Sequence, residues 1–131
     1  KHLIAVRKTY YSIRYGRQYL RPIRKSGKDF APSAPGDLIA WSRILDDEEV
    51  VCVVNGHGSE SRSTAILVDA VLNGGNASFF TVIANTEQAV ESGKPISHPI
   101  GSKASVKFDG CSSIDLKDIG PSEVVVLINK A

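Results

Sequence analysis

The chain has 131 residues, of which 42% are hydrophobic and 23% are charged, a balance typical of a single globular domain. No apolar run approaches the roughly 18 residues of a membrane-spanning helix, so we expect no membrane partner. The basic N-terminus lacks the apolar core of a signal peptide. The sequence contains no methionine and starts at Lys1, which indicates a processed product or a part of a longer protein. Its localisation is left unknown, with the cytoplasm slightly favoured.

The net charge of +2 hides an uneven distribution along the chain. Residues 1–28 carry nine Lys or Arg and no acid, whereas residues 29–131 carry seven basic and fourteen acidic side chains, a balance of −7. Such a split can mark an arm that binds nucleic acid or an acidic membrane. Apolar residues interleave the charges at helical spacing, which favours a helix lying against an acidic neighbour instead. We therefore expect no nucleic-acid partner.

Residues 1–15 have the pattern of one amphipathic helix. An apolar stripe at i, i+3, i+7 and i+10, widened by two further residues, consists of Leu3, Val6, Tyr10 and Ile13, with Ile4 and Tyr11. Gly16 follows the last periodic residue and suits a helix C-terminus. The stripe is broader than one β domain is expected to cover. We therefore expect the isolated chain to associate with itself through residues 1–15, or this helix to be loosely held.

Short strands are expected over the rest of the chain, and the clearest pair is a hairpin. Side chains at 38–45 alternate between a mostly apolar and a mixed face, and Val50–Val54 is apolar on both faces, as in a central strand. The acidic run 46–49 is expected to form the exposed turn between them. Further strands are expected at 18–23, 63–71, 79–84, 104–108, 113–116 and 124–128, separated by Gly- and Pro-rich turns and a long loop at 86–102.

This spacing predicts a mainly β fold. We expect an antiparallel Greek-key-type β-sandwich of about seven or eight strands, preceded by one N-terminal α-helix.

Patterns for catalysis and metal binding are weak. Three histidines lie far apart without metal-ligand spacing: His2, His57 and His98. Ser59, in the turn at 56–59, lacks the strand-to-helix context of a nucleophile elbow. The acids at 46–49 are typical of a solvated turn, whereas paired glycosidase carboxylates flank a substrate in a cleft. We therefore predict no catalytic, cofactor-binding or metal-binding residue and no cofactor.

Trp41 is the single tryptophan and could stack on a sugar, but a tryptophan on a half-buried strand more often packs against its own sheet or a neighbour. We predict that Trp41 is buried there or beneath the N-terminal helix, and that Arg43 on the same face anchors the sheet. Cys52 is expected to behave as a small hydrophobe, and a disulfide with Cys111 stays open. Residues 76–78 match a glycosylation triplet, which chance alone can supply at this length.

Three segments resemble the C-terminal region of α-amylase-family glycoside hydrolases. They are IAVRKTYYSIRYGRQYLRPIR at 4–24, LIAWSRILDDEEVVCVVN at 38–55 and PSEVVVLIN at 121–129. In that family the last helix of the (β/α)8 barrel ends near a small Gly, and the chain crosses into an all-β domain. One bacterial subgroup has a Gly-Arg-Gln-Tyr and an Arg-Pro-Ile pattern at this crossing, which are similar to Gly16–Tyr19 and Arg21–Ile23 here. The resemblance is weak from about 57 to 120.

The resemblance implies that 1–16 is the end of the last barrel helix and that 17–131 is the C-terminal β-sandwich. It implies a non-catalytic accessory domain that stabilises the barrel of a glycoside hydrolase or transglycosylase acting on α-glucans. The family's three catalytic carboxylates lie on barrel strands that this chain does not contain. We therefore expect no enzyme activity from the chain alone, and its partner to be the missing barrel. The alternatives are a module with weak α-glucan contact and an unrelated β-sandwich interaction domain.

Overall fold

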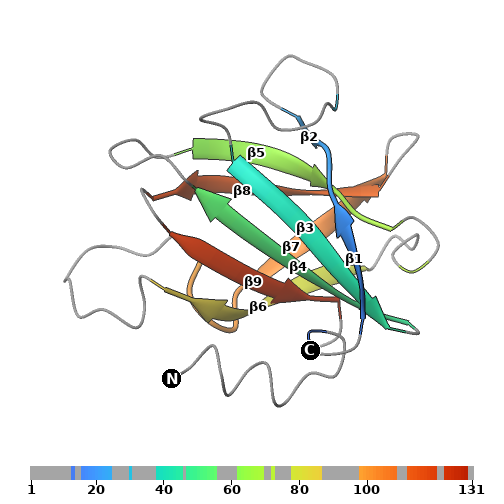
Figure 1. Ribbon diagram of the computed structural model, residues 1–131. Coiled ribbons are helices and arrows are strands. Elements are labelled where there is room, and N and C mark those ends of the chain that lie inside the picture. Colours follow the sequence, from blue (N-terminus) through green and yellow to red (C-terminus); the bar gives the residue numbers. More distant parts are fainter. Residues whose placement is uncertain are drawn as a thin grey trace.

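The computed structural model describes residues 13, 16–24, 30, 38–45, 47–55, 62–69, 72, 78–86, 98–108, 112–120 and 123–129. These residues form nine strands in one antiparallel sheet (Figure 1). The strands are β1 (Arg17–Leu20), β2 (Ile23–Arg24), β3 (Leu38–Leu45), β4 (Glu48–Asn55), β5 (Arg62–Leu67), β6 (Phe79–Asn85), β7 (Lys103–Phe108), β8 (Ser112–Ile119) and β9 (Val124–Ile128). Nothing in this described part of the chain is a helix with the length and apolar character needed to cross a membrane.

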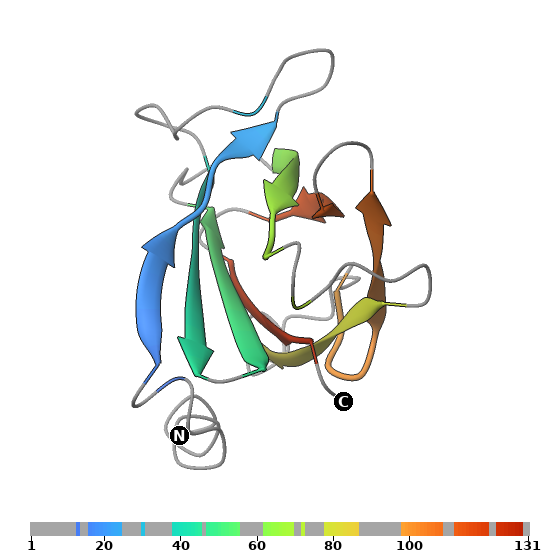
Figure 2. The same ribbon diagram turned by 90° about the vertical axis from the view of Figure 1, so that its right-hand side faces the viewer.

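The sheet curls round on itself until its two ends meet. Its order is β1-β3-β4-β9-β6-β7-β8-β5-β2, so the end strands β1 and β2 are consecutive in the chain, separated only by Arg21 and Pro22. Figure 2 shows the strands arranged around a common interior. Backbone hydrogen bonds close the seam, because the Arg21 N–H donates to the Ala40 carbonyl of β3 at 2.9 Å and the Leu67 N–H of β5 donates to the Pro22 carbonyl at 3.1 Å.

The mainly antiparallel β character predicted from the sequence is confirmed. The described residues form one curled sheet, and two separate packed sheets are not seen among them. The expected strand at 18–23 is divided at Pro22, because proline has no N–H to donate to a ladder, and its two halves join opposite ends of the sheet. The helix predicted at 1–15 lies outside the described residues apart from Ile13.

The predicted central hairpin is confirmed, with one correction at its turn. β3 and β4 pair from Leu38 opposite Asn55 to Leu45 opposite Glu48. β4 therefore begins at Glu48 rather than at Val50, and the connection is shorter than the acidic run suggests.

The main core fills the inside of the curl. Phe80 of β6 is the largest fully buried side chain there. Val51 and Val53 of β4 point into this core beside Val125 and Leu127 of β9, as side chains on one face of paired strands do. The other buried members of this core are Ile23, Leu38, Ala40, Ile66, Val68, Val82, Ile114, Leu116 and Ile119.

A second apolar cluster lies on the outward face of β4, β9 and β6. This outer cluster consists of Val50, Ile83, Ala84, Val126 and Ile128, which are 0–9% exposed. Ile13 is partly buried against it. The prediction that Val50–Val54 is covered on both faces is thus confirmed at Val50, and β4 lies within the sheet between β3 and β9.

Candidate functional site

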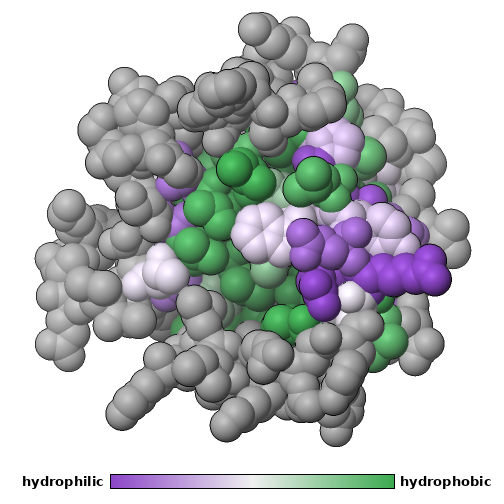
Figure 3. Space-filling model, viewed as in Figure 1, coloured by the Kyte–Doolittle hydropathy of each residue, from purple (hydrophilic) through white to green (hydrophobic). Residues whose placement is uncertain are grey.

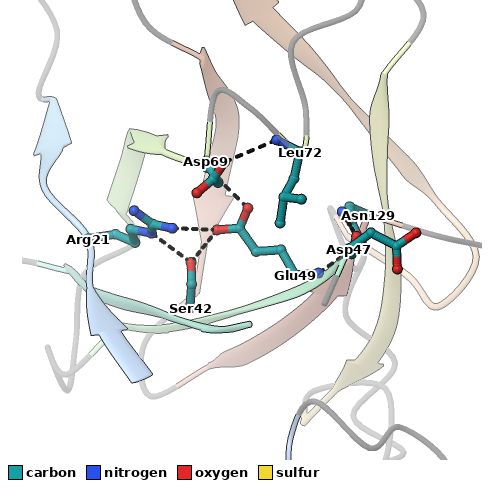
Figure 4. A network of polar contacts seen from close by, with 7 residues as sticks. All are labelled: Arg21, Ser42, Asp47, Glu49, Asp69, Leu72 and Asn129. Atoms are coloured by element: carbon teal, nitrogen blue, oxygen red, sulfur yellow. Dashed lines mark hydrogen bonds and ion pairs between the residues drawn. The ribbon is translucent and has the colours of Figure 1, made fainter. Parts of the chain in front are cut away.

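A buried polar network, centred on Glu49, lies inside one end of the curled sheet (Figure 4). The Glu49 side chain is fully buried, and its Oε2 accepts hydrogen bonds from Arg21 Nη2 at 2.9 Å and from Ser42 Oγ at 2.6 Å. Its Oε1 accepts the backbone N–H of Asp69 at 3.1 Å. Arg21 Nε donates to Ser42 Oγ at 2.8 Å. The network therefore joins the β1–β2 link to β3, β4 and the residues after β5.

Asn129 fastens the backbone of the same corner. Its Oδ1 accepts the Glu49 N–H at 2.9 Å, its own N–H donates to the Glu49 carbonyl at 3.1 Å, and its Nδ2 donates to the Asp47 carbonyl at 3.0 Å. Since Asn129 follows β9 directly, these bonds tie the end of the chain's last strand to the β3–β4 turn.

The sequence analysis is wrong about Glu49, which it places in an exposed turn. Because β4 begins two residues earlier than predicted, at Glu48, the alternation of the strand turns Glu49 inward with Val51 and Val53. A fully buried carboxylate needs a matching charge and donors for its oxygens, and Arg21 with its neighbours supplies both.

A second buried carboxylate, Glu123, lies among amides. Its Oε1 accepts the Gly120 N–H at 3.1 Å, and its Oε2 accepts from Asn85 Nδ2 at 3.2 Å. Asn55 Nδ2 donates to the carbonyls of Ile119 and Gly120 at 2.9 and 3.0 Å. Asn85 also donates to the carbonyl of His98 at 2.7 Å. These bonds fix the turn between β8 and β9 against the ends of β4 and β6.

The two buried carboxylates are too far apart to act as a catalytic pair. The Asn55 N–H donates to the Glu123 carbonyl at 3.0 Å, so Glu123 lies beside the far end of β4. Asn55 is six residues from Glu49 along that strand, a distance of about 20 Å. Paired glycosidase carboxylates lie roughly 5–10 Å apart. Both carboxylates are also engaged by donors from the protein, which indicates that they hold the fold together.

The described histidine also has a structural contact. His98 Nε2 lies 2.6 Å from the Lys117 carbonyl, joining the segment before β7 to β8. No group of three or more His, Cys, Asp and Glu side chains that could hold a metal ion occurs in the described ranges. His2, His57 and Ser59, and the triplet 76–78, lie outside the described residues.

Trp41 lies on the outward face of β3 and is half-buried, rather than buried as predicted. The register pairs it with Leu20 of β1 on one side and with Cys52 of β4 on the other. Tyr19 is paired with Ser42, so Tyr19 and Trp41 belong to opposite faces of the sheet. The two aromatic rings therefore do not form a shared platform for a sugar.

Arg43, on the same face as Trp41, donates a hydrogen bond to the side-chain amide of Gln18. Its Nη1 donates to Gln18 Oε1 at 3.2 Å, which links β3 to β1. Arg43 thus contacts a glutamine of the end strand, and its role as an anchor of the sheet stays a prediction.

An uncovered apolar surface adjoins Trp41 on the outward face. Leu20 is 76% exposed and Ile39 is 45% exposed, and both share the face of Trp41. We call these three residues the open strip. Figure 3 shows hydrophobic residues gathered on this side of the molecule over β3, β4 and β9. Exposed apolar area of this kind is typical of a surface that another protein segment covers.

Cys52 lies opposite Trp41 on β4 and is a free thiol, so it forms no disulfide in this structure. Burial raises the pKa of the Cys52 thiol from 9.0 to about 11, against a smaller lowering by the charge of Arg43. The thiolate is the reactive form of a cysteine. Cys52 is therefore held in its unreactive form at neutral pH.

We expect native Cys52 to react with iodoacetamide at pH 8 roughly a hundredfold more slowly than the urea-unfolded chain, because a rise of two pKa units lowers the thiolate fraction by about that factor. The measurement uses the Cys111→Ser variant, so that the thiol followed by mass spectrometry is Cys52. The native rate should rise steeply as the pH approaches 11. A native rate within about threefold of the unfolded rate at pH 8 would contradict the burial described here.

No protein-family model matches the chain, and none of the curated proteins matches it. The resemblance to the amylase family is therefore not supported by these comparisons and stays a prediction.

Proposed function

We propose that this chain is a non-catalytic C-terminal accessory domain of an α-amylase-family glycoside hydrolase or transglycosylase that acts on α-glucans. In this proposal residues 1–16 end the last barrel helix, residues 17–131 form the β-sandwich domain, and the domain packs against the barrel and stabilises it. The parent enzyme supplies the catalytic carboxylates. The two buried carboxylates of this chain maintain its own fold.

One observation carries the proposal. The segments that resemble the amylase family supply β1, β3, β4 and β9, which are four adjacent strands of the sheet, together with the two-residue β2 at the other end of the strand order. The open strip lies on the outward face of this part of the sheet. A shared sequence pattern and an uncovered apolar surface thus coincide, as expected where a domain meets a fixed neighbour.

The energetics favour a covered state for the open strip. Burying a Leu or Ile side chain that was fully exposed contributes roughly 1.5–3 kcal/mol. Leu20, at 76% exposure, retains most of this gain, and Ile39, at 45%, retains about half. A surface with this composition fits a partner with apolar side chains. An α-glucan module has less support, because Tyr19 and Trp41 belong to opposite faces.

We expect the coding sequence upstream of Lys1 to encode a barrel of several hundred residues, and the longer polypeptide to act on starch. The 131-residue chain alone should release nothing from starch, maltooligosaccharides or a nitrophenyl α-glucoside. In the longer polypeptide, Leu20→Ser combined with Ile39→Ser should lower the temperature of thermal inactivation by roughly 2–5 °C, because it weakens the packing between domains. The initial rate at low temperature should be unchanged.

The matched control is Lys107→Ser combined with Asp115→Ser, which removes an exposed ion pair on the β7–β8 hairpin. This control should leave the inactivation temperature within about 1 °C, since exposed ion pairs contribute little. An upstream sequence without a barrel, or turnover by the short chain that the loss of one carboxylate abolishes, would overturn the proposal.

A further inference from the structure

β1 pairs with another strand on one side only. Its neighbour in the strand order is β3, and the bonds that close the seam lie at Arg21 and Pro22, beyond the end of β1. All four side chains of β1 are exposed, and Leu20 is 76% exposed. β1 is therefore an edge strand at the surface, as its place in Figure 2 shows. An edge strand presents main-chain donors and acceptors to which another strand can bind.

The register shows which main-chain groups of β1 face outward from the sheet. The Arg21 N–H donates to the Ala40 carbonyl, and these two residues lie opposite each other in continuation of the β1–β3 register. In an antiparallel pair, hydrogen-bonded and non-hydrogen-bonded positions alternate. Tyr19 therefore bonds to β3, whereas Gln18 and Leu20 direct their N–H and C=O groups away from it. No other strand of the described ranges pairs with these groups.

An apolar surface begins at this edge and continues over the outward face. Leu20 lies opposite Trp41, and Ile39 is on the same face two residues before Trp41, so the open strip starts at the edge itself. A strand added to β1 places every second side chain on this face. An apolar side chain beside Leu20 would cover it and extend the open strip by one strand.

The same edge is positively charged. Residues 16–24 contain three arginines and residues 38–45 contain one, and neither range contains an acid. Arg43 lies opposite Gln18 and donates to its Oε1 at 3.2 Å, so the guanidinium group reaches toward the edge. Among the residues that the structure describes, no carboxylate pairs with Arg43, and its Nε is buried without an acceptor. A partly buried charge of this kind is stabilised by an acceptor of opposite charge.

We propose that an extended segment of a neighbouring polypeptide adds to the sheet along β1, with an acidic residue beside Gln18 and an apolar residue beside Leu20. Main-chain bonds to these two residues supply affinity, and the two side chains supply selectivity. Neighbouring strands lie about 4.8 Å apart, so the residue beside Gln18 is about 10 Å from Arg43, a span that an arginine and a glutamate bridge together. A second copy of β1 contains no acid and offers Arg43 no partner.

This mode of binding goes beyond the proposed function, because it specifies how a neighbour contacts the sheet and not which enzyme the neighbour belongs to. The test needs only the 131-residue chain and a peptide. A failure of strand addition would therefore leave the barrel contact, which is tested by thermal inactivation of the longer polypeptide, unaffected.

The test uses amide exchange, followed by NMR, and a capped peptide of sequence Thr-Glu-Thr-Leu-Thr-Glu-Thr-Leu. Glutamate and leucine share one face of this peptide when it is extended. Without peptide, the Tyr19 amide should exchange at least tenfold more slowly than those of Gln18 and Leu20, after correction for intrinsic rates. We expect a Kd of about 1 mM or below. At a peptide concentration ten times the Kd, exchange at Gln18 and Leu20 should slow at least fivefold.

The acidic partner is tested with Arg43→Gln. This variant should raise the Kd of the glutamate peptide at least fivefold, and that of the same peptide with glutamine in place of glutamate less than twofold. The matched control is Lys107→Gln, which removes one positive charge on the β7–β8 hairpin and changes the net charge equally. Lys107→Gln should change the Kd of either peptide less than twofold.

Absence of binding at 10 mM peptide, or binding that leaves the Gln18 and Leu20 amides exchanging at their free rates, would overturn strand addition at this edge. These two results come from the unsubstituted chain and do not depend on how a variant folds. Equal effects of Arg43→Gln and Lys107→Gln would overturn the acidic partner. Protection of the two amides that rises with protein concentration in the absence of peptide would assign the edge to a second copy of the chain instead.

Discussion

Replacing Glu49 by alanine should lower the free energy of unfolding by about 3–5 kcal/mol, because it leaves a largely buried charge without its partner. The Arg21 side chain is 14% exposed and donates to the Glu49 carboxylate at 2.9 Å. The substitution also removes the acceptor for Ser42 Oγ and for the Asp69 N–H. Urea denaturation at neutral pH, followed by circular dichroism, measures the change.

The matched control for Glu49 is Asp115, a carboxylate paired with Lys107 at the surface of the β7–β8 hairpin. Asp115→Ala should lower the free energy of unfolding by less than about 1 kcal/mol, because water screens an exposed pair. Glu49→Gln keeps an oxygen acceptor but removes the charge, so its effect should lie between those of the two alanine variants. Similar losses for Glu49→Ala and Asp115→Ala would contradict a structural role for the Glu49 network.

The burial of Glu49 could not be obtained from local polarity. Four consecutive acids are typical of a solvated turn, and that signal outweighs the alternation of a short strand. A weaker signal was present, since Glu49 is two residues before Val51 and four before Val53 on the same face. The pairing of Leu38 with Asn55 at the other end of the hairpin sets the register of the two strands. This register decides whether Glu49 belongs to the turn or to the inward face of the strand.

The strand positions were largely predictable, whereas their order was not. Turn residues and alternation depend on neighbours in the chain, but the pairing of β2 with β5 depends on residues about forty positions apart. Pro22 indicated the end of a strand. It could not indicate that the next two residues join the opposite end of the sheet, which is the step that closes the curl.

β8 also extends beyond its predicted end at residue 116. Lys117 and Asp118 are polar and exposed, so sequence analysis ends the strand before them. Asp118 has a φ of 54°, a left-handed conformation that Asp tolerates better than most residues. Its N–H donates a hydrogen bond to Ser63 Oγ at 2.9 Å. β8 thus continues to Ile119 through a local irregularity of the backbone, which a pattern of polar and apolar residues does not predict.

Replacing Phe80 by alanine should lower the free energy of unfolding by about 3–5 kcal/mol, because a fully buried ring leaves a cavity inside the curl. Phe79 is the matched control: it is adjacent and partly buried, with Lys103 Nζ 4.4 Å from its ring centroid. Phe79→Ala should lower the stability by less than about 2 kcal/mol, since less apolar area and one partly exposed cation–π contact are lost. The difference between the two losses of stability reports on the register of β6, because a slip of one residue would move Phe79 to the inward face of the sheet and Phe80 to the outward face. A larger loss at Phe79 than at Phe80 would show that β6 presents its other face to the core.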